Sequence, residues 1–168
     1  MALLRDQELA GFRTRAAGEP IIAASDHWLV LLDGGRPVSA LPPGLTLDSV
    51  TAPPPIIVAP ADLDLDTALA SDAFADADDA EAVVLVEDGG IAGVWSGPSL
   101  SMAVLQGPAR SAAAAVLPGS PQIPLIVRSC AFREGGRICA TVSSFASKPF
   151  PMPGCRNDRQ LTAHAFAW

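Results

Sequence analysis

Short runs of apolar residues, each bounded by glycine, proline or aspartate, dominate the alternation of hydrophobic and polar positions along this chain. In residues 28–41, and again in residues 83–95, an apolar run leads through Asp-Gly-Gly into a second apolar run. The Asp-Gly pair readily takes the positive φ angles that tight β-hairpins require. The pattern therefore predicts two β-hairpins, and the offset of 55 residues between the two motifs indicates duplication of one unit.

Helical spacing and short apolar runs predict the remaining elements of the first 120 residues. In residues 2–16, apolar side chains recur at helical spacing, and Gly18 with Pro20 marks the end of that helix. The acidic start and the apolar side of residues 64–74 predict a second helix. Four more elements complete the prediction: helices at 98–106 and 109–116, and strands at Ile21–Ala23 and Ile56–Val58.

A third hairpin is predicted between residues 124 and 145, around Gly135-Gly136. If these glycines form a two-residue turn, Cys130 pairs with Thr141, and Phe132 pairs with Cys139. These four side chains then share one face, because side chains alternate between the two faces of a strand. The two cysteines become diagonal neighbours with Cα atoms about 7–8 Å apart, which suits two ligands of one metal better than a disulfide. A register shifted by one residue would separate them.

The three cysteines and one of the two histidines follow a mirrored spacing, Cys130-x8-Cys139-x15-Cys155-x8-His164. Thiolates and imidazole are the ligands that zinc prefers, and four protein ligands complete a closed structural site. The alternative is that Cys130 and Cys139 are simply small buried residues of their strands. Phe166 and Trp168 follow closely in the chain, and we expect them to cover the site.

Charge is distributed unevenly along the 168 residues. Residues 1–120 carry five basic and sixteen acidic side chains, a net charge of −11, whereas residues 121–168 carry six basic and two acidic side chains, a net charge of +4. The acidic body disfavours nucleic acid as a partner. We expect a repeat-containing body at 1–106, a helix and linker at 107–123, and a hairpin with the metal site at 124–168.

The sequence contains no apolar run that approaches the length of a membrane helix, and its first residues lack a signal-peptide pattern. A cytoplasmic location without membrane contact is therefore the expectation. Thiols stay reduced in the cytoplasm, so the cysteines are interpreted as metal ligands or core residues before disulfides.

The order strand, helix, strand, Asp-Gly-Gly turn, strand and helix resembles the cystathionine-β-synthase-type regulatory domain, the CBS domain. The second copy, about Ile56 to Gln106, is the fuller match. The first copy, about Pro20 to Ser49, is shorter, and Leu41-Pro42-Pro43-Gly44 stands where its last helix would be. The resemblance implies an α/β, or α+β, fold of two CBS-like βαββα repeats, to which the C-terminal hairpin and loop add an appendage.

The same resemblance implies that an adenosine nucleotide binds between the repeats. Gly93 and Ser96 match the glycine and hydroxyl positions of the family's binding run, and Ser99 stands where the family has a ribose-binding aspartate. A hydroxyl does not accept two ribose hydrogen bonds as a carboxylate does. Ser96 and Ser99 are therefore the candidate nucleotide-binding residues of a degenerate pair. Domains of this family often associate, which implies a homodimer.

These features favour a non-catalytic regulatory or protein-interaction module, with a protein partner and a structural zinc site. The sequence contains no P-loop, nucleophile elbow or complete calcium loop. One alternative is a small zinc metalloenzyme, in which water replaces one of the four protein ligands. Another is contact with RNA or DNA through six basic residues: Arg128, Arg133, Arg137, Lys148, Arg156 and Arg159.

Overall fold

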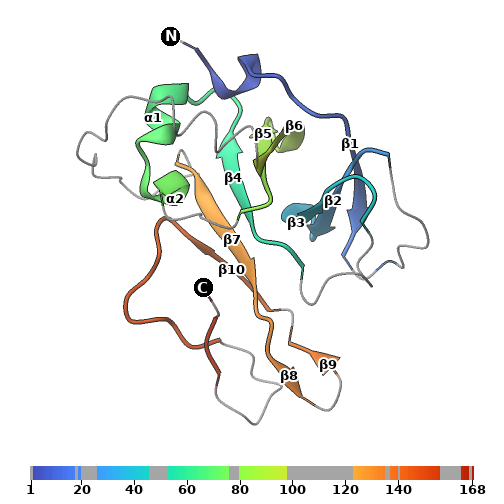
Figure 1. Ribbon diagram of the computed structural model, residues 1–168, viewed down its shortest axis with the longest axis vertical. Helices are drawn as coiled ribbons and strands as arrows, with labels where there is room; N and C mark the ends of the chain where they lie inside the picture. Colours follow the sequence, from blue (N-terminus) through green and yellow to red (C-terminus); the bar gives the residue numbers. More distant parts are fainter. Residues whose placement is uncertain are drawn as a thin grey trace.

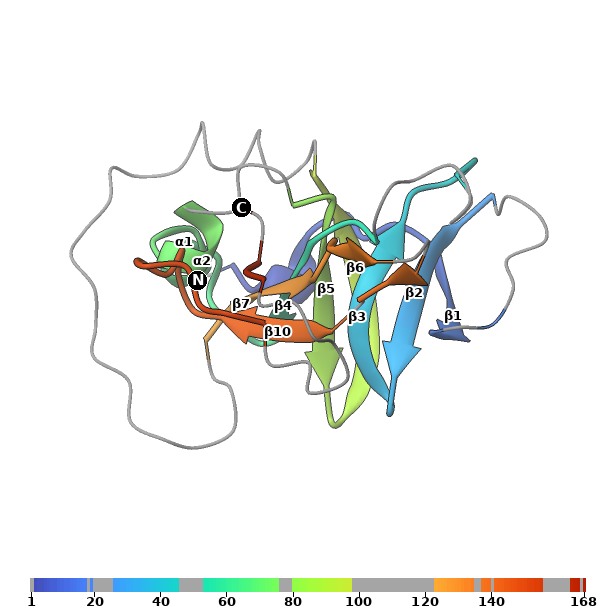
Figure 2. The same ribbon diagram turned by 90° about the horizontal axis from the view of Figure 1, so that it is seen from below.

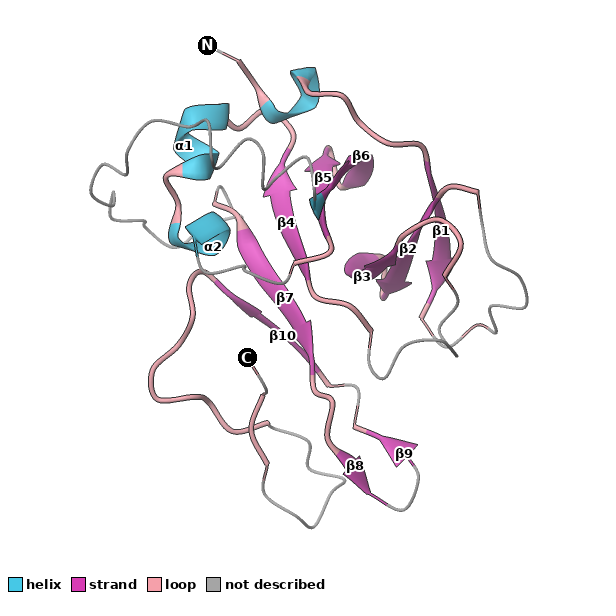
Figure 3. Ribbon diagram, in the orientation of Figure 1, coloured by secondary structure: helices cyan, strands magenta, loops and turns pink. Residues whose placement is uncertain are grey.

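The computed structural model of this chain is a mixed α+β fold built in three layers (Figure 1). Two short helices cover one face of a five-stranded sheet, and a three-stranded sheet packs against the other face (Figures 2 and 3). The structure describes residues 2–17, 19, 26–45, 53–75, 80–97, 123–134, 137–139, 141–155, 164–166 and 168.

The three-stranded sheet is formed by the first part of the chain. After a 3-10 turn at Leu4–Asp6, β1 (Phe12–Ala16) pairs in parallel with β2 (Trp28–Asp33). Strand β2 then turns back into β3 (Arg36–Leu41) through Gly34 and Gly35, whose φ angles are +55° and +80°. The first Asp-Gly-Gly motif therefore forms the hairpin that the sequence predicts.

The second unit begins with β4 (Ile56–Pro60), which runs parallel to β5 (Ala82–Glu87). Two short helices, α1 (Leu65–Leu69) and α2 (Asp72–Ala75), lie in the connection between them. Strand β5 pairs with β6 (Gly90–Ser96) in the second predicted hairpin. The Asp64 carboxylate caps α1 by accepting the backbone N–H of Thr67, which explains the acidic helix start.

Each helix buries the apolar side that the sequence indicates. Phe74 lies in the core, and Leu65 and Leu69 pack against the same core cluster. The single helix expected over 64–74 is divided into α1 and α2, with Ala70 and Ser71 between them.

The two units repeat the same strand pairing. Each consists of a strand, a crossover to a parallel neighbour, and an antiparallel hairpin. Five residue pairs join β1 to β2 and five join β4 to β5, and both hairpins carry one irregularity at the same distance from the turn. The strands superpose in register at an offset of 54 residues, because Trp28 in β2 corresponds to Ala82 in β5.

The turn residues explain why the motif offset of 55 is one residue too large. In the second hairpin the turn is formed by Asp88 and Gly89, with φ angles of +50° and +77°, whereas two glycines form it in the first. Aspartate tolerates the left-handed conformation better than most residues. The second Asp-Gly-Gly motif is therefore shifted by one position relative to its strands.

The C-terminal hairpin extends the five-stranded sheet. Strand β7 (Leu125–Ser129) pairs antiparallel with β4 on one side and with β10 (Val142–Phe145) on the other. Beyond β7, the two-residue strands β8 (Arg133–Glu134) and β9 (Arg137–Ile138) continue the same antiparallel register. We call the continuous unit 125–145 the ribbon. The part expected as an appendage thus contributes two strands of the main sheet, in the order β10-β7-β4-β5-β6.

The hydrophobic core has two main clusters, one on each face of the five-stranded sheet. In β5, Val83 and Leu85 face the helices, whereas Ala82 and Val84 face the other sheet. This alternation follows from the two-residue period of a strand and explains why the sheet strands are apolar at nearly every position.

The helix expected over residues 2–16 is wrong. Its apolar residues face different clusters: Leu4 is buried near the helices, while Phe12 packs between the two sheets. The second half of the segment forms β1, because β2 offers it an unpaired edge. Tertiary pairing therefore overrides the helical spacing.

Several expected elements lie outside the described residues, namely the strand at 21–23 and the helices at 98–106 and 109–116. Among the helices in the described part of the chain, none has the length and apolar character needed to cross a membrane.

Leu85 tests whether the helix-facing core carries the fold. The Leu85→Ala variant should lose about 2–5 kcal/mol of unfolding free energy, because Leu85 is fully buried and its removal leaves a cavity. Urea denaturation measures this change. Leu45→Ala is the matched control, since Leu45 is 39% exposed and its loss should cost less than about 0.5 kcal/mol. Equal losses in the two variants would contradict the described core.

Candidate metal centre

The ribbon positions the first two candidate ligands as its predicted register requires. The backbone N–H of Cys130 donates to the carbonyl oxygen of Thr141 at 2.8 Å, and that of Cys139 donates to the carbonyl oxygen of Phe132 at 2.8 Å. The pairs expected from a turn at Gly135-Gly136 are therefore confirmed. Cys130 and Cys139 lie on opposite strands as diagonal neighbours, and the thiol of Cys139 approaches the Thr141 hydroxyl at 3.2 Å.

A second antiparallel pairing positions the other two candidates. Gly154 and Ala165 form an isolated β-bridge, and next to it the N–H of Cys155 donates to the carbonyl oxygen of His164 at 2.8 Å. Cys155 and His164 are thus direct cross-strand neighbours. Each half of the mirrored x8 spacing corresponds to one pair of antiparallel segments, and the metal ligands lie where the two pairs meet.

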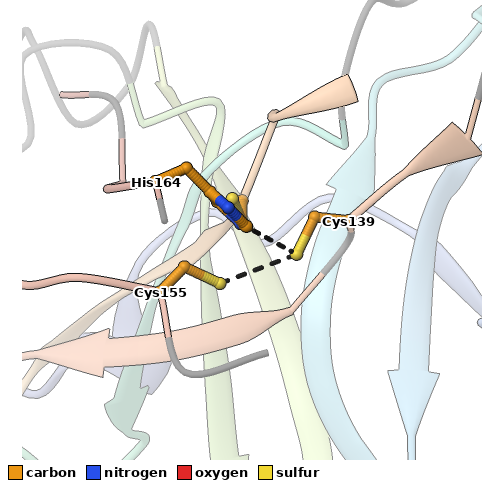
Figure 4. A group of neighbouring side chains, drawn as sticks. Cys139, Cys155 and His164 are labelled. Atoms are coloured by element: carbon orange, nitrogen blue, oxygen red, sulfur yellow. Dashed lines mark hydrogen bonds between the residues drawn. The ribbon is translucent and has the colours of Figure 1, made fainter. Parts of the chain in front are cut away.

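The four side chains converge on one point. The Sγ atom of Cys139 lies 3.6 Å from the Sγ atom of Cys155 and 3.4 Å from Nε2 of His164 (Figure 4). One ligand atom from each of Cys130, Cys139, Cys155 and His164 lies within 4.8 Å of the other three. The prediction that these four residues come together is confirmed.

The distances fit a tetrahedral zinc ion. With zinc–sulfur bonds of about 2.3 Å and zinc–nitrogen bonds of about 2.0 Å, the edges of the tetrahedron are about 3.8 Å between sulfurs and about 3.6 Å from sulfur to nitrogen. The contacts of Cys139 match these edges to within a few tenths of an ångström. The widest separation, 4.8 Å, requires a contraction of about 1 Å.

Phe132 and Thr141 surround the ligands and help to orient them. The ring of Phe132 stacks on the imidazole of His164, with ring centroids 4.2 Å apart and an angle of 10° between the planes. The hydroxyl of Thr141 donates to the Cys139 sulfur when that sulfur is a thiolate. Such contacts to ligands hold them in a binding geometry before the metal arrives.

Phe166 and Trp168 pack beside the centre, on the ribbon. The ring of Phe166 meets Phe145 edge-on with centroids 5.6 Å apart, and Trp168 meets Phe145 at 5.7 Å. The guanidinium of Arg128 lies 4.3 Å from the centre of the Trp168 ring. Among the aromatic contacts of the described residues, the one on the ligand imidazole comes from Phe132. The sequence places Phe132 on the correct face but does not reveal this stacking.

Burial controls the protonation of Cys130. Loss of water raises the pKa of its thiol from the ordinary 9.0 to about 11, and the neighbouring thiols of Cys155 and Cys139 add to the rise. In the metal-free protein this thiol is therefore neutral at physiological pH. A divalent cation reverses the preference, because it binds the thiolate.

Other candidate residues from the sequence have different surroundings. Ser96 lies at the end of β6 and pairs with Ala82, whereas Ser99 lies outside the described residues. In the basic set, Arg128 is only 8% exposed and lies under Trp168, so its guanidinium is covered. Arg133 and Lys148 are exposed, and Arg156 and Arg159 lie outside the described residues.

Comparisons with models of protein families, with curated proteins and with solved structures found no match for this chain. The CBS-domain resemblance therefore stays a prediction that rests on the sequence motifs.

The raised pKa of Cys130 predicts how the stability of the metal-free, reduced protein depends on pH. Above pH 9 the thiol ionises in the unfolded chain but stays protonated in the folded chain until about pH 11. The unfolding free energy should therefore be unaffected by this group below pH 9 and fall by up to about 1.4 kcal/mol per pH unit above it.

Urea titrations of the metal-free protein at a series of pH values measure this slope. Cys130→Ala is the control, because the variant lacks the thiol and should lose this part of the slope. An identical slope in the variant would show that burial of Cys130 does not cause it.

Proposed function

We propose that this protein is a non-catalytic regulatory or interaction module whose C-terminal region is held together by a structural zinc ion. The observation that carries the proposal is the convergence of three thiols and one imidazole within 4.8 Å, supplied by two separate antiparallel pairs. Zinc is the metal that this donor set favours, since thiolate and imidazole ligands in tetrahedral geometry are typical of it.

The donor count supports a structural role over catalysis. A catalytic zinc ion usually has three protein ligands and a water in the fourth position, which supplies the reactive hydroxide. Here four side chains approach the tetrahedral positions, so the site is closed to water when all of them bind. A metalloenzyme would require one of the four, most simply His164, to stay off the metal.

The zinc ion connects two parts of the chain that are distant in sequence. His164, Phe166 and Trp168 alternate along one segment, which we call the tail, and all three side chains contact the ribbon. Aromatic contacts of this kind contribute about 0.5–1.5 kcal/mol each. Structural zinc contributes apparent binding energies on the order of 10 kcal/mol in small peptides, so the metal dominates the attachment of the tail.

The repeated strand pairing supports a scaffold built by duplication, as in a degenerate CBS-like pair. Both units have the same order of parallel and antiparallel neighbours and the same register. We infer that the pair serves protein contacts, including self-association into a homodimer, more than nucleotide binding. The argument is chemical: serine replaces the ribose-binding aspartate at position 99.

The two histidines of the chain provide a matched test of the metal centre. Protein purified without added metal should contain one zinc ion per chain, measured by elemental analysis. His164→Ala should lower the zinc affinity at least 10-fold and lower the melting temperature, because it removes a ligand. His27→Ala should retain the full zinc content, since His27 bonds to Asp26 far from the centre in sequence and structure.

Two results would contradict this proposal. Wild-type protein that is fully folded and metal-free, and whose melting temperature a chelator leaves unchanged, would exclude a structural ion. A His164→Ala variant that binds zinc as tightly as wild type and gains a hydrolytic activity would favour the metalloenzyme.

Adenosine nucleotides test the ligand part of the proposal. Adding AMP, ADP or ATP at millimolar concentration should leave the melting temperature within about 1 °C of the ligand-free value, whereas a ligand that binds the native state raises it. A rise of several degrees that disappears in Ser96→Ala would show that the pair binds nucleotide after all.

A further inference from the structure

We propose that Cys139 and Cys155 form an oxidant-responsive pair, in which a peroxide converts the two metal-binding thiolates into a disulfide and thereby releases the zinc ion. The inference rests on the proposed metal centre and adds a regulation to it. It is carried by the different surroundings of the three cysteines and by the contact between two of them.

Distance selects this pair. The Sγ atoms of Cys139 and Cys155 lie 3.6 Å apart, which is close enough for one sulfur to attack the other after oxidation. A disulfide bond is about 2.0 Å long, so the two sulfurs must approach by about 1.6 Å. Cys139 lies in the short connection between β9 and β10, and Cys155 lies next to an isolated bridge. Neither sits within a continuous ladder that would resist the movement.

Exposure selects the same two residues. Cys130 is fully buried, whereas Cys139 and Cys155 are partly exposed. A small oxidant in solution therefore reaches the sulfurs of Cys139 and Cys155 before that of Cys130. Oxidation of thiols follows access and thiolate character, and zinc binding keeps both sulfurs in the thiolate form.

The reaction balances with one molecule of peroxide. One thiolate attacks a peroxide oxygen, so that an S–O bond forms, the O–O bond breaks and hydroxide leaves. The second thiolate then attacks the sulfur of this sulfenic acid, so that the S–S bond forms, the S–O bond breaks and a second hydroxide leaves. The two sulfurs lose two electrons, the peroxide gains them, and two protons from water neutralise the hydroxides.

Disulfide formation removes two of the four zinc ligands. Cys130 and His164 remain, and two ligands do not hold zinc as tightly as four. His164 then loses the bond that fixes the start of the tail, while Phe166 and Trp168 keep only their contacts with Phe145 and Arg128. The oxidant signal thus reaches the tail through the metal centre.

The experiment uses the full chain. Zinc per chain is measured first, so that failure of the metal centre is seen at this step, before any peroxide is added. Hydrogen peroxide is then added to the zinc-loaded protein, and a chromophoric chelator follows released zinc. We expect one zinc ion to be released for each disulfide formed, a loss of about 2 Da in the intact mass, and reversal of both by dithiothreitol.

The basic residues allow the disulfide to be assigned by tryptic digestion without reduction. Arg128 and Arg133 bracket Cys130, while Arg137 and Arg156 bracket both Cys139 and Cys155, with Lys148 protected by the following proline. A bond between Cys139 and Cys155 therefore lies within one peptide. A bond that involves Cys130 links two peptides.

Two variants complete the test. Cys130→Ser should still form the internal disulfide, and Cys155→Ser should form none. Zinc-loaded protein that gives only sulfinic acids, or a cross-link to the Cys130 peptide, would overturn the inference and leave the metal centre intact. Protein that contains no zinc before peroxide is added would overturn both proposals.

Discussion

The antiparallel register of the ribbon is the constraint on which the metal centre depends. One pairing scheme runs from Ile126 opposite Phe145 to Glu134 opposite Arg137, and it carries Cys130 and Cys139 between these ends. A slip of one residue would turn one cysteine to the opposite face and separate the two thiols. The same ribbon joins the main sheet through β7 and β4, so the metal centre is built on the hydrophobic core.

The sequence predicts those parts of the fold that depend on local chemistry. All three hairpins follow from glycine and aspartate at turns, and the pairing of Cys130 and Cys139 across the third follows from a two-residue turn. The four metal ligands could be named because zinc chemistry limits the choice to thiols and imidazole, and the chain contains only five such residues. The position of Asp64 at a helix start also followed from local electrostatics.

The parts that could not be predicted depend on contacts between distant segments. Residues 12–16 form a strand because β2 lies beside them, and nothing in their own spacing reveals that neighbour. The pairing of β7 with β4 likewise joins segments separated by more than 60 residues, so the sheet was larger than expected. Within the site, the stacking of Phe132 on His164 depends on the path of the tail, which local rules do not determine.

The proposed function follows from the contrast between this centre and the rest of the molecule. The two repeated units form a packed scaffold, whereas the titratable and metal-binding chemistry of the C-terminal region is concentrated in four side chains. The central claim is that these four bind zinc with no water ligand. X-ray absorption at the zinc edge tests it most directly: the account predicts three sulfur neighbours at about 2.3 Å and one nitrogen at about 2.0 Å. A spectrum with two sulfurs or fewer, or with an oxygen in the first coordination shell, would contradict it.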